Sequence, residues 1–360
     1  MKKNILLIGT FPPPISGVSL ANLVLRKGLQ IRGINVGFIN TENQTKIKGN
    51  TGSISLDKFK VLISYFQIYK IPFYRIVNIT IGQTFFGVCK YLPFLLITKI
   101  FRIPTIVHLH GGYLKNEFEN QSVIKKKFML FTLNLFDYGI VLSESLTSHL
   151  SFFLSREKIF ICKNFFQDRL YPNLQINKNY SEVRLIFLSN LIEGKGINLL
   201  LKALESIDSS KIKVRVAGNI PPENEKVKLL MQNLTNVEYL GVVEGKEKIK
   251  LLEWGNVFCL PTFYDRGEGQ PISIIEAMAF GSLILTTKHG GIPDICTDKN
   301  AIFVKKNDVE DLRIKINEII NHKQIIETKG ILNKDYANKN FKEEIFISSM
   351  IKIFEKCRKN

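Results

Sequence analysis

The sequence has 360 residues, of which 45% are apolar and 23% are charged. This length and balance suit a folded protein of two domains and give no reason to invoke disorder. The formal net charge is +18 and uneven, since residues 1–172 carry 22 basic and 8 acidic side chains, whereas residues 173–360 carry 28 and 24. A basic half predicts contact with an anionic membrane, a phosphorylated substrate or nucleic acid. A lysine-rich compositional bias is the plain alternative, although it does not explain the asymmetry.

The charge pattern, the cysteines and the apolar segments disfavour several function classes. The basic residues accompany apolar runs and form no recognisable nucleic-acid module, so we do not expect nucleic-acid binding. The five cysteines are scattered and form no C-x-x-C pair, which predicts neither a disulfide framework nor a zinc site and favours a reducing compartment. The apolar run after Met1 is too short for a signal peptide, and residues 76–100 are interrupted by Asn78, Gln83, Lys90 and Pro93, which disfavours a spanning helix. We therefore expect a cytoplasmic protein.

Short β-branched runs alternate with longer amphipathic segments along the chain. The predicted strands are 4–9, 34–39, 75–81, 104–110, 138–142, 183–188, 212–217, 237–240, 256–260 and 283–286. The predicted helices are 17–31, 88–101, 121–135, 196–207, 223–233, 245–253, 271–280 and 308–321, followed by a helical tail from Asn340. This alternation predicts an α/β fold in which helices cover both faces of parallel sheets.

Two such series indicate two Rossmann-like domains facing each other across a cleft. We place the boundary in the polar loop 171–182, which gives an N-terminal domain over 1–172 and a C-terminal domain over 173–340. The last segment, 341–360, is expected to form a helix that packs back on the N-terminal domain.

Two motifs of the first half could carry chemistry. In GTFPPPISGVSL (9–20) a strand ends and a helix begins near Gly17, so backbone N–H groups could face an anionic ligand; an ordinary rigid loop explains it equally well. In HLHGGY (108–113), His108 and His110 share one face of a strand. His110 stands at the carboxyl end, where α/β sheets bind ligands, whereas His108 has a good structural interpretation. A metal pair is disfavoured because no third ligand lies nearby.

Three motifs of the second half follow predicted strands. Lys195 precedes a helix in LSNLIEGKGINLLLKAL (188–204), where it either binds an anion or is simply solvated. In PTFYDRGEGQPISIIEAMAFG (261–281), Glu268 lies in a Gly-rich loop and Glu276 on a helix of apolar residues. A buried carboxylate needs hydrogen-bond donors, such as a ribose diol, or else an ion pair or partial exposure. TTKHGGIPDI (286–295) offers a second backbone cradle.

Together these segments resemble the retaining GT-B glycosyltransferases of family 4, also described as glycosyl transferases group 1. SNLIEGKGINLLLKAL, VAGN, VEYLGVV, VFCLPTFYDRGEGQPISIIEAMAFG and HGGIPDI occur in the family's order, and the E-x7-E element in this context is specific. The resemblance covers nearly the whole chain and is strongest over 183–295.

The resemblance implies that the first domain binds the acceptor and the second binds a nucleotide-sugar donor. Lys195 would contact the donor diphosphate, Glu276 the ribose and Glu268 the transferred sugar, and His110 would lie near the donor sugar and the acceptor. The backbone of Gly269 and Gln270 would lie near the phosphates, and Gly17 would approach them.

There are departures from the family pattern. The family commonly has Gly-Arg before the phosphate lysine, whereas Ser189-Asn190 stand here, so Asn190 supplies no charge to the donor site and we hypothesise that Arg266 replaces it. The first loop has Ile15-Ser16-Gly17 in place of the usual double glycine.

The family further implies a retaining hexosyl transfer by front-face displacement, with His110 and Glu268 as the catalytic residues. No D-x-D motif is present, so we expect neither a metal nor another cofactor beside the nucleotide-sugar. The implied acceptor is a lipid-linked saccharide or a growing surface polysaccharide.

The basic, aromatic-rich segments 58–75 and 113–136 favour a peripheral position on the anionic inner face of the cell membrane; core helices with lysine-rich outer faces are the alternative. The competing functions are a nucleotide-sugar epimerase of GT-B architecture and a catalytically degenerate subunit that binds a partner.

Overall fold

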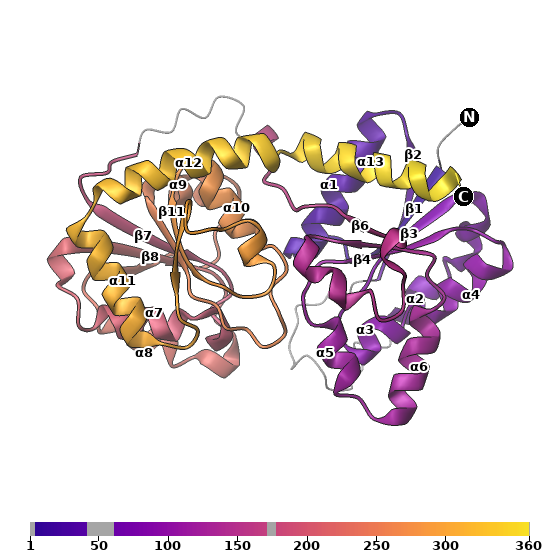
Figure 1. Ribbon diagram of the computed structural model, residues 1–360, viewed down its shortest axis with the longest axis horizontal. Coiled ribbons are helices and arrows are strands. Elements are labelled where there is room, and N and C mark those ends of the chain that lie inside the picture. Colours follow the sequence, from indigo (N-terminus) through magenta and orange to yellow (C-terminus); the bar gives the residue numbers. More distant parts are fainter. Residues whose placement is uncertain (1–3, 42–60, 171–177, 360) are drawn as a thin grey trace. The chain divides into compact units, whose positions relative to one another are not determined.

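The structure is a computed structural model that describes residues 4–41, 61–170 and 178–359. The chain forms two compact units (Figure 1). Unit 1 comprises Met1–Asn164 together with Glu343–Asn360, and unit 2 comprises Phe165–Lys342. Unit 2 thus starts earlier than the polar loop at 171–182, because the Phe166 amide donates to the Phe341 carbonyl at 2.9 Å and joins the beginning and end of that unit.

Unit 1 is built on one six-stranded parallel sheet in the order β2-β1-β3-β4-β5-β6. Its strands are β1 (Asn4–Gly9), β2 (Asn35–Asn40), β3 (Ile76–Thr80), β4 (Thr105–Leu109), β5 (Tyr138–Val141) and β6 (Ile159–Ile161). Its helices are α1 (Gly17–Ile31), α2 (Val61–Tyr65), α3 (Phe85–Cys89), α4 (Leu92–Ile100), α5 (Leu114–Glu119), α6 (Val123–Leu133) and α13 (Glu343–Lys359), with a 3-10 helix η2 (Ile68–Phe73).

Local sequence explains where these elements begin and end. Helix α1 begins at a capping box, in which the Ser16 hydroxyl accepts from the Ser19 amide at 3.1 Å and the Ser19 hydroxyl accepts from the Ser16 amide at 2.8 Å. The single helix predicted over 88–101 is wrong, since α3 and α4 are separate, with Pro93 in the first turn of α4. The sequence also misses β6, which is too short to show a clear pattern.

The C-terminal helix α13 belongs to unit 1. It packs against α1, where Gly28 leaves room for the side chain of Ile347: a Cβ at Gly28 would lie 2.1 Å from the Ile347 Cδ1. Arg32 at the end of α1 pairs with Glu344 at the start of α13. The last segment of the chain therefore completes the helical layer beside β1 and β2.

Unit 2 is built on a second six-stranded parallel sheet in the order β12-β11-β10-β7-β8-β9. Its strands are β7 (Val183–Leu188), β8 (Ile212–Ala217), β9 (Val237–Tyr239), β10 (Val257–Leu260), β11 (Leu283–Thr287) and β12 (Ala301–Val304). Its helices are α7 (Ile197–Leu204), α8 (Val227–Gln232), α9 (Gly245–Trp254), α10 (Ile272–Ala279), α11 (Val309–Asn321) and α12 (Gln324–Asn340).

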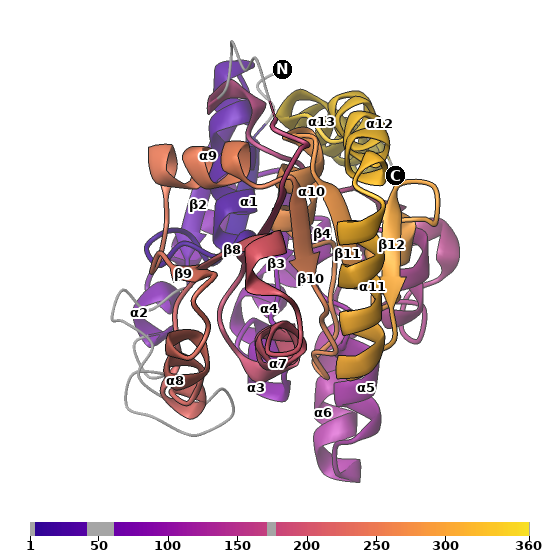
Figure 2. The same cartoon turned by 90° about the vertical axis from the view of Figure 1, so that its left-hand side faces the viewer.

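The helices of unit 2 form two groups. Helix α7 packs beside α8 and α11, whereas α10 packs on α12, which in turn contacts β11 (Figure 2). Strand β12 and helix α12 were not predicted, because β12 is only half-buried at the sheet edge and polar residues fill most of α12. The α/β fold of two Rossmann-like sheets is confirmed.

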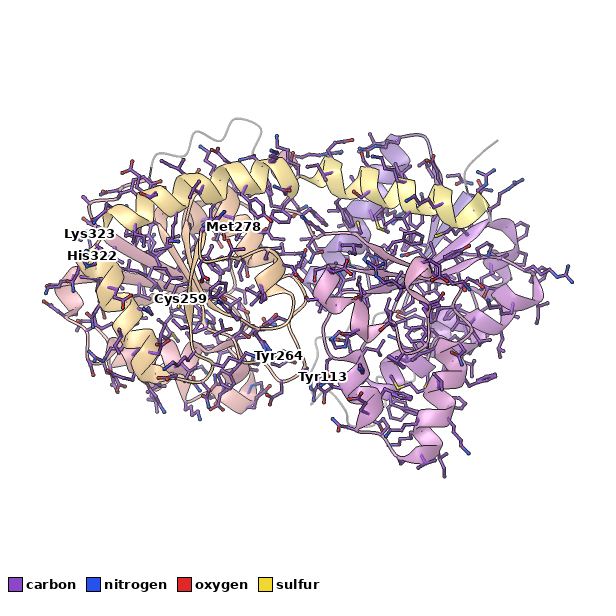
Figure 3. The ribbon with its side chains drawn as sticks, viewed as in Figure 1. Tyr113, Cys259, Tyr264, Met278, His322 and Lys323 are labelled. Atoms are coloured by element: carbon purple, nitrogen blue, oxygen red, sulfur yellow. The ribbon has the colours of Figure 1, made fainter. Side chains whose placement is uncertain are left out.

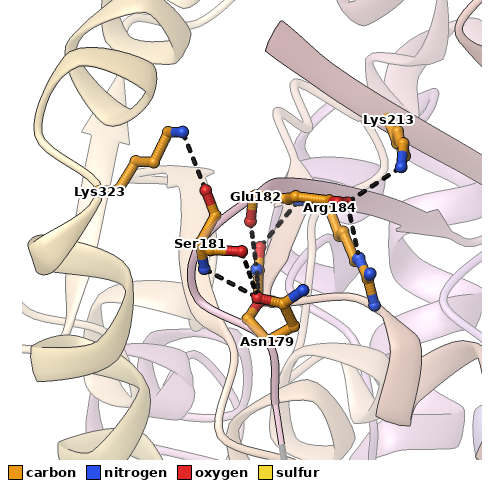
Figure 4. A network of polar contacts seen from close by, with 7 residues as sticks. Asn179, Ser181, Glu182, Arg184, Lys213 and Lys323 are labelled. Atoms are coloured by element: carbon orange, nitrogen blue, oxygen red, sulfur yellow. Dashed lines mark hydrogen bonds and ion pairs between the residues drawn. The ribbon is translucent and has the colours of Figure 1, made fainter.

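The entry of the chain into unit 2 is held by a polar network (Figure 4). The Asn179 side-chain oxygen accepts from the Ser181 amide at 2.9 Å and from its hydroxyl at 2.6 Å, and Lys323 donates to the Ser181 carbonyl at 2.9 Å. Glu182 accepts from Arg184 at 3.3 Å and from Lys213 at 3.1 Å. These contacts fix the start of β7, the strand that leads into the candidate site.

Candidate active site

The parallel strands of unit 2 end at one edge of the sheet, where the loops after β7, β10 and β11 meet. Strand β7 lies between β10 and β8. The next two strands of the chain, β8 and β9, lie on one side of β7, and β10, β11 and β12 lie on its other side. The direction in which strands are added therefore reverses at β7. Open α/β sheets bind ligands at such a topological switch point, outside the carboxyl ends of the strands. The residues that the sequence singles out in this unit follow these three strands.

Lys195 and Glu268 form an ion pair across the switch point. Lys195 ends a 3-10 turn after β7, and Glu268 lies in the loop after β10, where it is 5% exposed. The carboxylate oxygen that contacts Lys195 also accepts from the Thr262 hydroxyl at 2.8 Å. A lysine and a carboxylate, each named separately from the sequence, therefore lie in direct contact.

The loop that carries Glu268 is fastened to both neighbouring loops. The Phe263 amide donates to the Gly194 carbonyl at 2.8 Å, and the Gly291 amide donates to the Glu268 carbonyl at 3.1 Å. A His289 ring nitrogen lies 2.8 Å from the Tyr264 carbonyl. Figure 3 shows Tyr264 on this loop, with Cys259 of β10 and Met278 of α10 in the interior of unit 2. These hydrogen bonds fix the Glu268 loop against the loops after β7 and β11.

Two glycines make this close packing possible. Gly290 has φ +54°, and a Cβ there would lie 2.1 Å from the Glu268 carbonyl oxygen. Gly196 has φ +84°, and a Cβ there would lie 2.3 Å from the Pro261 carbonyl oxygen. Glycine is required at both positions because side chains disfavour this backbone region and no space remains for one. The cradle predicted at Gly290 holds the protein's own Glu268 loop.

Glu276 lies on α10, where it is 3% exposed among buried apolar neighbours. Its Oε1 accepts from the Lys248 ammonium at 2.5 Å, and the Lys248 side chain, on α9, is 18% exposed. The ion pair was one of the alternatives that the sequence left open for this carboxylate. Lys248 itself was missed: it stands far from Glu276 in the sequence, on a helix whose other lysines are exposed.

The other residues predicted at the donor site lie around these pairs. Asn190 is exposed just after β7. Arg266 is half-buried in the Glu268 loop, while Gly269 and Gln270 of that loop are buried. Asn190, Arg266, Gly269 and Gln270 thus belong to the same two loops as Lys195 and Glu268.

Gly17 and His110 belong to unit 1. Gly17 is exposed at the first position of α1, after β1, and His110 follows β4; strand β3 separates these two strands in the sheet. The rings of His108 and His110 lie 4.1 Å apart, as their shared face predicts. Burial lowers the pKa of His108 well below its usual range and that of His110 to about 4, so both imidazoles are neutral at pH 7.

The glycines after His110 have a local structural reason. A Cβ at Gly111 would lie 2.0 Å from the side-chain nitrogen of Gln83, whose oxygen accepts from the Tyr113 amide at 2.5 Å. The space beside Gly111 is therefore filled by the side chain of Gln83. Within residues 4–41, 61–170 and 178–359, no three His, Cys, Asp or Glu side chains are grouped to hold a metal ion, and no helix is long and apolar enough to cross a membrane.

Two α/β units, each built on a six-stranded parallel sheet, give the chain the GT-B fold. A crystal structure of HepE from Anabaena with UDP superposes with a TM-score of 0.73 and 16% identity, covering 98% of this chain and 100% of that one. This likeness concerns the fold.

Residues 174–340, which lie within unit 2, match the family described as Glycosyl transferases group 1. An uncharacterized glycosyltransferase of Methanocaldococcus jannaschii is 26% identical over 257 residues, which are 70% of this chain and 68% of the relative. The gpi3 subunit of the phosphatidylinositol N-acetylglucosaminyltransferase of Schizosaccharomyces pombe is 23% identical over 218 residues, 58% of this chain and 47% of that one. The protein is therefore a glycosyltransferase that uses nucleotide-sugar donors.

Proposed function

We propose that this chain transfers a hexose, with retention of its anomeric configuration and without a metal ion, from a nucleoside-diphosphate sugar to a lipid-linked saccharide or surface polysaccharide. The acceptor would be presented at the anionic cytoplasmic face of the cell membrane. The observation that carries the donor half of this proposal is the Lys195–Glu268 pair at the switch point of unit 2.

The pair supplies opposite charges where a nucleotide-sugar needs them. The Lys195 ammonium would stabilise the negative charge that develops on the departing diphosphate, assisted by backbone amides of Gly269 and Gln270, by Arg266 and by the polar side chain of Asn190. Glu268 would then face the transferred sugar, and Glu276 would accept hydrogen bonds from the ribose. In this scheme a lysine performs the charge neutralisation that other transferases assign to a metal ion.

His110 would act as a neutral hydrogen-bonding group beside the sugar. Because burial lowers its pKa to about 4, the imidazole carries no charge at pH 7 and offers one donor and one acceptor nitrogen. We expect a His110→Ala variant to lose turnover while keeping its affinity for the free nucleotide. Nucleotide affinity that falls together with turnover would contradict this role.

The acceptor half rests on the exposed surface of unit 1. Helix α6 packs on α3, and together they present the α6 patch, defined as the exposed apolar side chains of Phe86, Val123, Ile124, Phe128 and Phe131. Lys125 and Lys127 are exposed between them and Lys126 is half-buried, while Met129 and Leu133 face the core. Exposed apolar side chains interleaved with lysines suit an interface with anionic lipid.

A second exposed group lies on α2 and η2. Its apolar members are Leu62, Ile63, Phe66, Tyr69 and Phe73. Residues 58–60 of the predicted membrane segment lie outside the described residues. A lipid acceptor also agrees with the name of the Schizosaccharomyces pombe relative, which gives phosphatidylinositol as the molecule it acts on.

The donor half is tested by thermal unfolding of the purified protein with UDP, GDP, ADP, dTDP or CMP, each with and without EDTA. A ligand at about 100 times its Kd adds about 2.7 kcal/mol to the free energy of unfolding, which raises the melting temperature visibly. We expect one nucleotide to raise it, with no change on adding EDTA. A shift that disappears with EDTA would contradict metal independence, and no shift with any nucleotide would contradict a working donor site.

The acceptor half is tested by flotation with vesicles of phosphatidylcholine alone or mixed with phosphatidylglycerol. We expect binding to the anionic vesicles at low salt, loss of binding at high salt, and loss of binding in an Ile124→Asp, Lys125→Glu, Lys127→Glu variant. Leu229→Asp, which changes an exposed leucine on α8 of unit 2, serves as the control and should bind like the wild type. No binding to anionic vesicles at low salt would refute the membrane interface.

A further inference from the structure

The ion pair between Lys248 and Glu276 involves only one of the two carboxylate oxygens of Glu276. Oε1 of Glu276 accepts from the Lys248 ammonium at 2.5 Å. Across the part of the chain that the structure describes, Oε2 of Glu276 has no hydrogen-bond partner. One oxygen is therefore held by Lys248, and the other has no partner among the described residues.

The setting of Glu276 makes this partner necessary. Its side chain is only 4% exposed, and the residues around it on α10, Ile274, Ile275, Ala277 and Met278, are all buried and apolar. A carboxylate in such surroundings is costly unless a counter-charge and hydrogen bonds compensate for the lost water. Lys248 provides both, and it comes from α9, a different helix.

Lys248 differs from the other lysines of α9. Lys246 and Lys250 are exposed to solvent and form no ion pair within the described ranges, whereas the Lys248 side chain is 18% exposed and turned toward α10. Helix α9 thus carries one partly buried lysine, Lys248, and two exposed lysines, Lys246 and Lys250, whose substitution can serve as a control.

We propose that Lys248 is a positioning residue of the donor site, which holds Oε1 of Glu276 so that Oε2 is directed at the ribose hydroxyls of the bound nucleotide. This inference rests on the proposed function, in which Glu276 contacts the ribose. Lys248 sharpens that role: it fixes the rotamer of the carboxylate and keeps it as an acceptor. The preference of the enzyme for a ribonucleotide over a deoxyribonucleotide then depends on a residue that does not itself need to touch the sugar.

The energetic consequence is specific to the ribose. A carboxylate that is fixed in place can accept from the 2′-hydroxyl as well as the 3′-hydroxyl, and hydrogen bonds to charged groups are strong. Without Lys248, the Glu276 side chain loses its fixed orientation and its counter-charge. We therefore expect the Lys248→Met variant to bind the ribonucleotide about 10- to 100-fold more weakly, while its affinity for the 2′-deoxynucleotide changes much less.

The test is calorimetric titration with UDP, ADP and GDP and with their 2′-deoxy forms. The proteins are the wild type, Lys248→Met, Lys248→Arg, Glu276→Gln, the double variant Lys248→Met with Glu276→Gln, and the control Lys250→Met. Methionine preserves the length and apolar packing of the lysine stem, and Lys248→Gln replaces it if the methionine variant does not fold.

The expected result has three parts. The wild type and Lys250→Met prefer the ribonucleotide, Lys248→Met loses that preference, and Lys248→Arg recovers most of it. Lys248→Met adds little to the loss already caused by Glu276→Gln, because both changes remove the same interaction.

Each contrary result has its own meaning. If Lys248→Met retains the wild-type preference for the ribonucleotide, or if its effect simply adds to that of Glu276→Gln, the positioning role is refuted while the donor site stands. If the wild type binds none of the nucleotides, the proposed function is contradicted, and the role of Lys248 in positioning Glu276 for the ribose is contradicted with it.

Discussion

Replacing Gly290 by alanine tests how the Glu268 loop is positioned. The φ angle of Gly290 is +54°, and an alanine Cβ there would lie 2.1 Å from the Glu268 carbonyl oxygen and 2.8 Å from its carbonyl carbon. The left-handed backbone costs an alanine about 1–2 kcal/mol. Forcing the Glu268 backbone away costs about 1–3 kcal/mol more, as overpacking typically does. The free energy of unfolding should therefore fall by about 2–5 kcal/mol.

Gly241 supplies the matched control in the same unit. Its φ angle is +70°, but a Cβ there meets no heavy atom within 4 Å, so Gly241→Ala carries only the backbone cost. Urea unfolding gives the stability of both variants, and steady-state transfer gives their turnover. We expect a loss of about 1–2 kcal/mol with normal turnover for Gly241→Ala. For Gly290→Ala we expect turnover about 100-fold lower, because the carboxylate is misplaced. Equal losses of stability and turnover in the two variants would refute the packing argument.

Three further predictions concern charge and packing elsewhere. Lys195→Ala should abolish the nucleotide-induced rise in melting temperature, because the diphosphate loses its ammonium partner, whereas Lys202→Ala should keep the rise; a normal rise in the Lys195 variant would contradict this role. Burial lowers the pKa of Lys178 to about 7, so between about pH 7 and pH 10 the unfolded chain binds more protons than the folded one and the free energy of unfolding rises with pH. Urea unfolding across that range should show this slope weakened in Lys178→Met but unchanged in Lys250→Met, and identical slopes would contradict it. Ile347→Ala on α13 should lower the free energy of unfolding by about 2–5 kcal/mol, because Ile347 is fully buried, whereas Ile345→Ala, at a position 38% exposed, should cost far less by the same measurement; equal losses would contradict the packing of α13 on unit 1.

The fold was largely readable from the sequence because each buried strand is a short apolar run followed by a turn and an amphipathic helix. The elements that were missed have physical reasons. Strands β6 and β12 are short and half-buried. In α12 the buried side chains Ile326, Asn333 and Ala337 are separated by many polar residues, so no apolar pattern indicates the helix. Local patterns cannot reveal an element whose burial is decided by its tertiary neighbours.

The candidate site was readable only in part. Lys195, Glu268 and Glu276 stand out because charged residues at strand ends or in apolar helices require a reason. Their partners do not stand out, since the contact of Lys195 with Glu268 and of Lys248 with Glu276 joins segments far apart in the chain. Gly290 was visible as a glycine, but its role in packing against the Glu268 loop depends on the neighbouring strand.

The central claim is that the two ion pairs of unit 2, Lys195–Glu268 and Lys248–Glu276, mark the site that binds the nucleotide of the donor. The most direct measurement is calorimetric titration of the wild type, Lys195→Ala and Glu276→Gln with the nucleotide that stabilises the wild type. The account predicts one site per chain in the wild type and a loss of affinity of at least about tenfold in each variant, as expected when a charged hydrogen-bond partner is removed. Wild-type affinity in both variants would place the donor elsewhere and contradict the account.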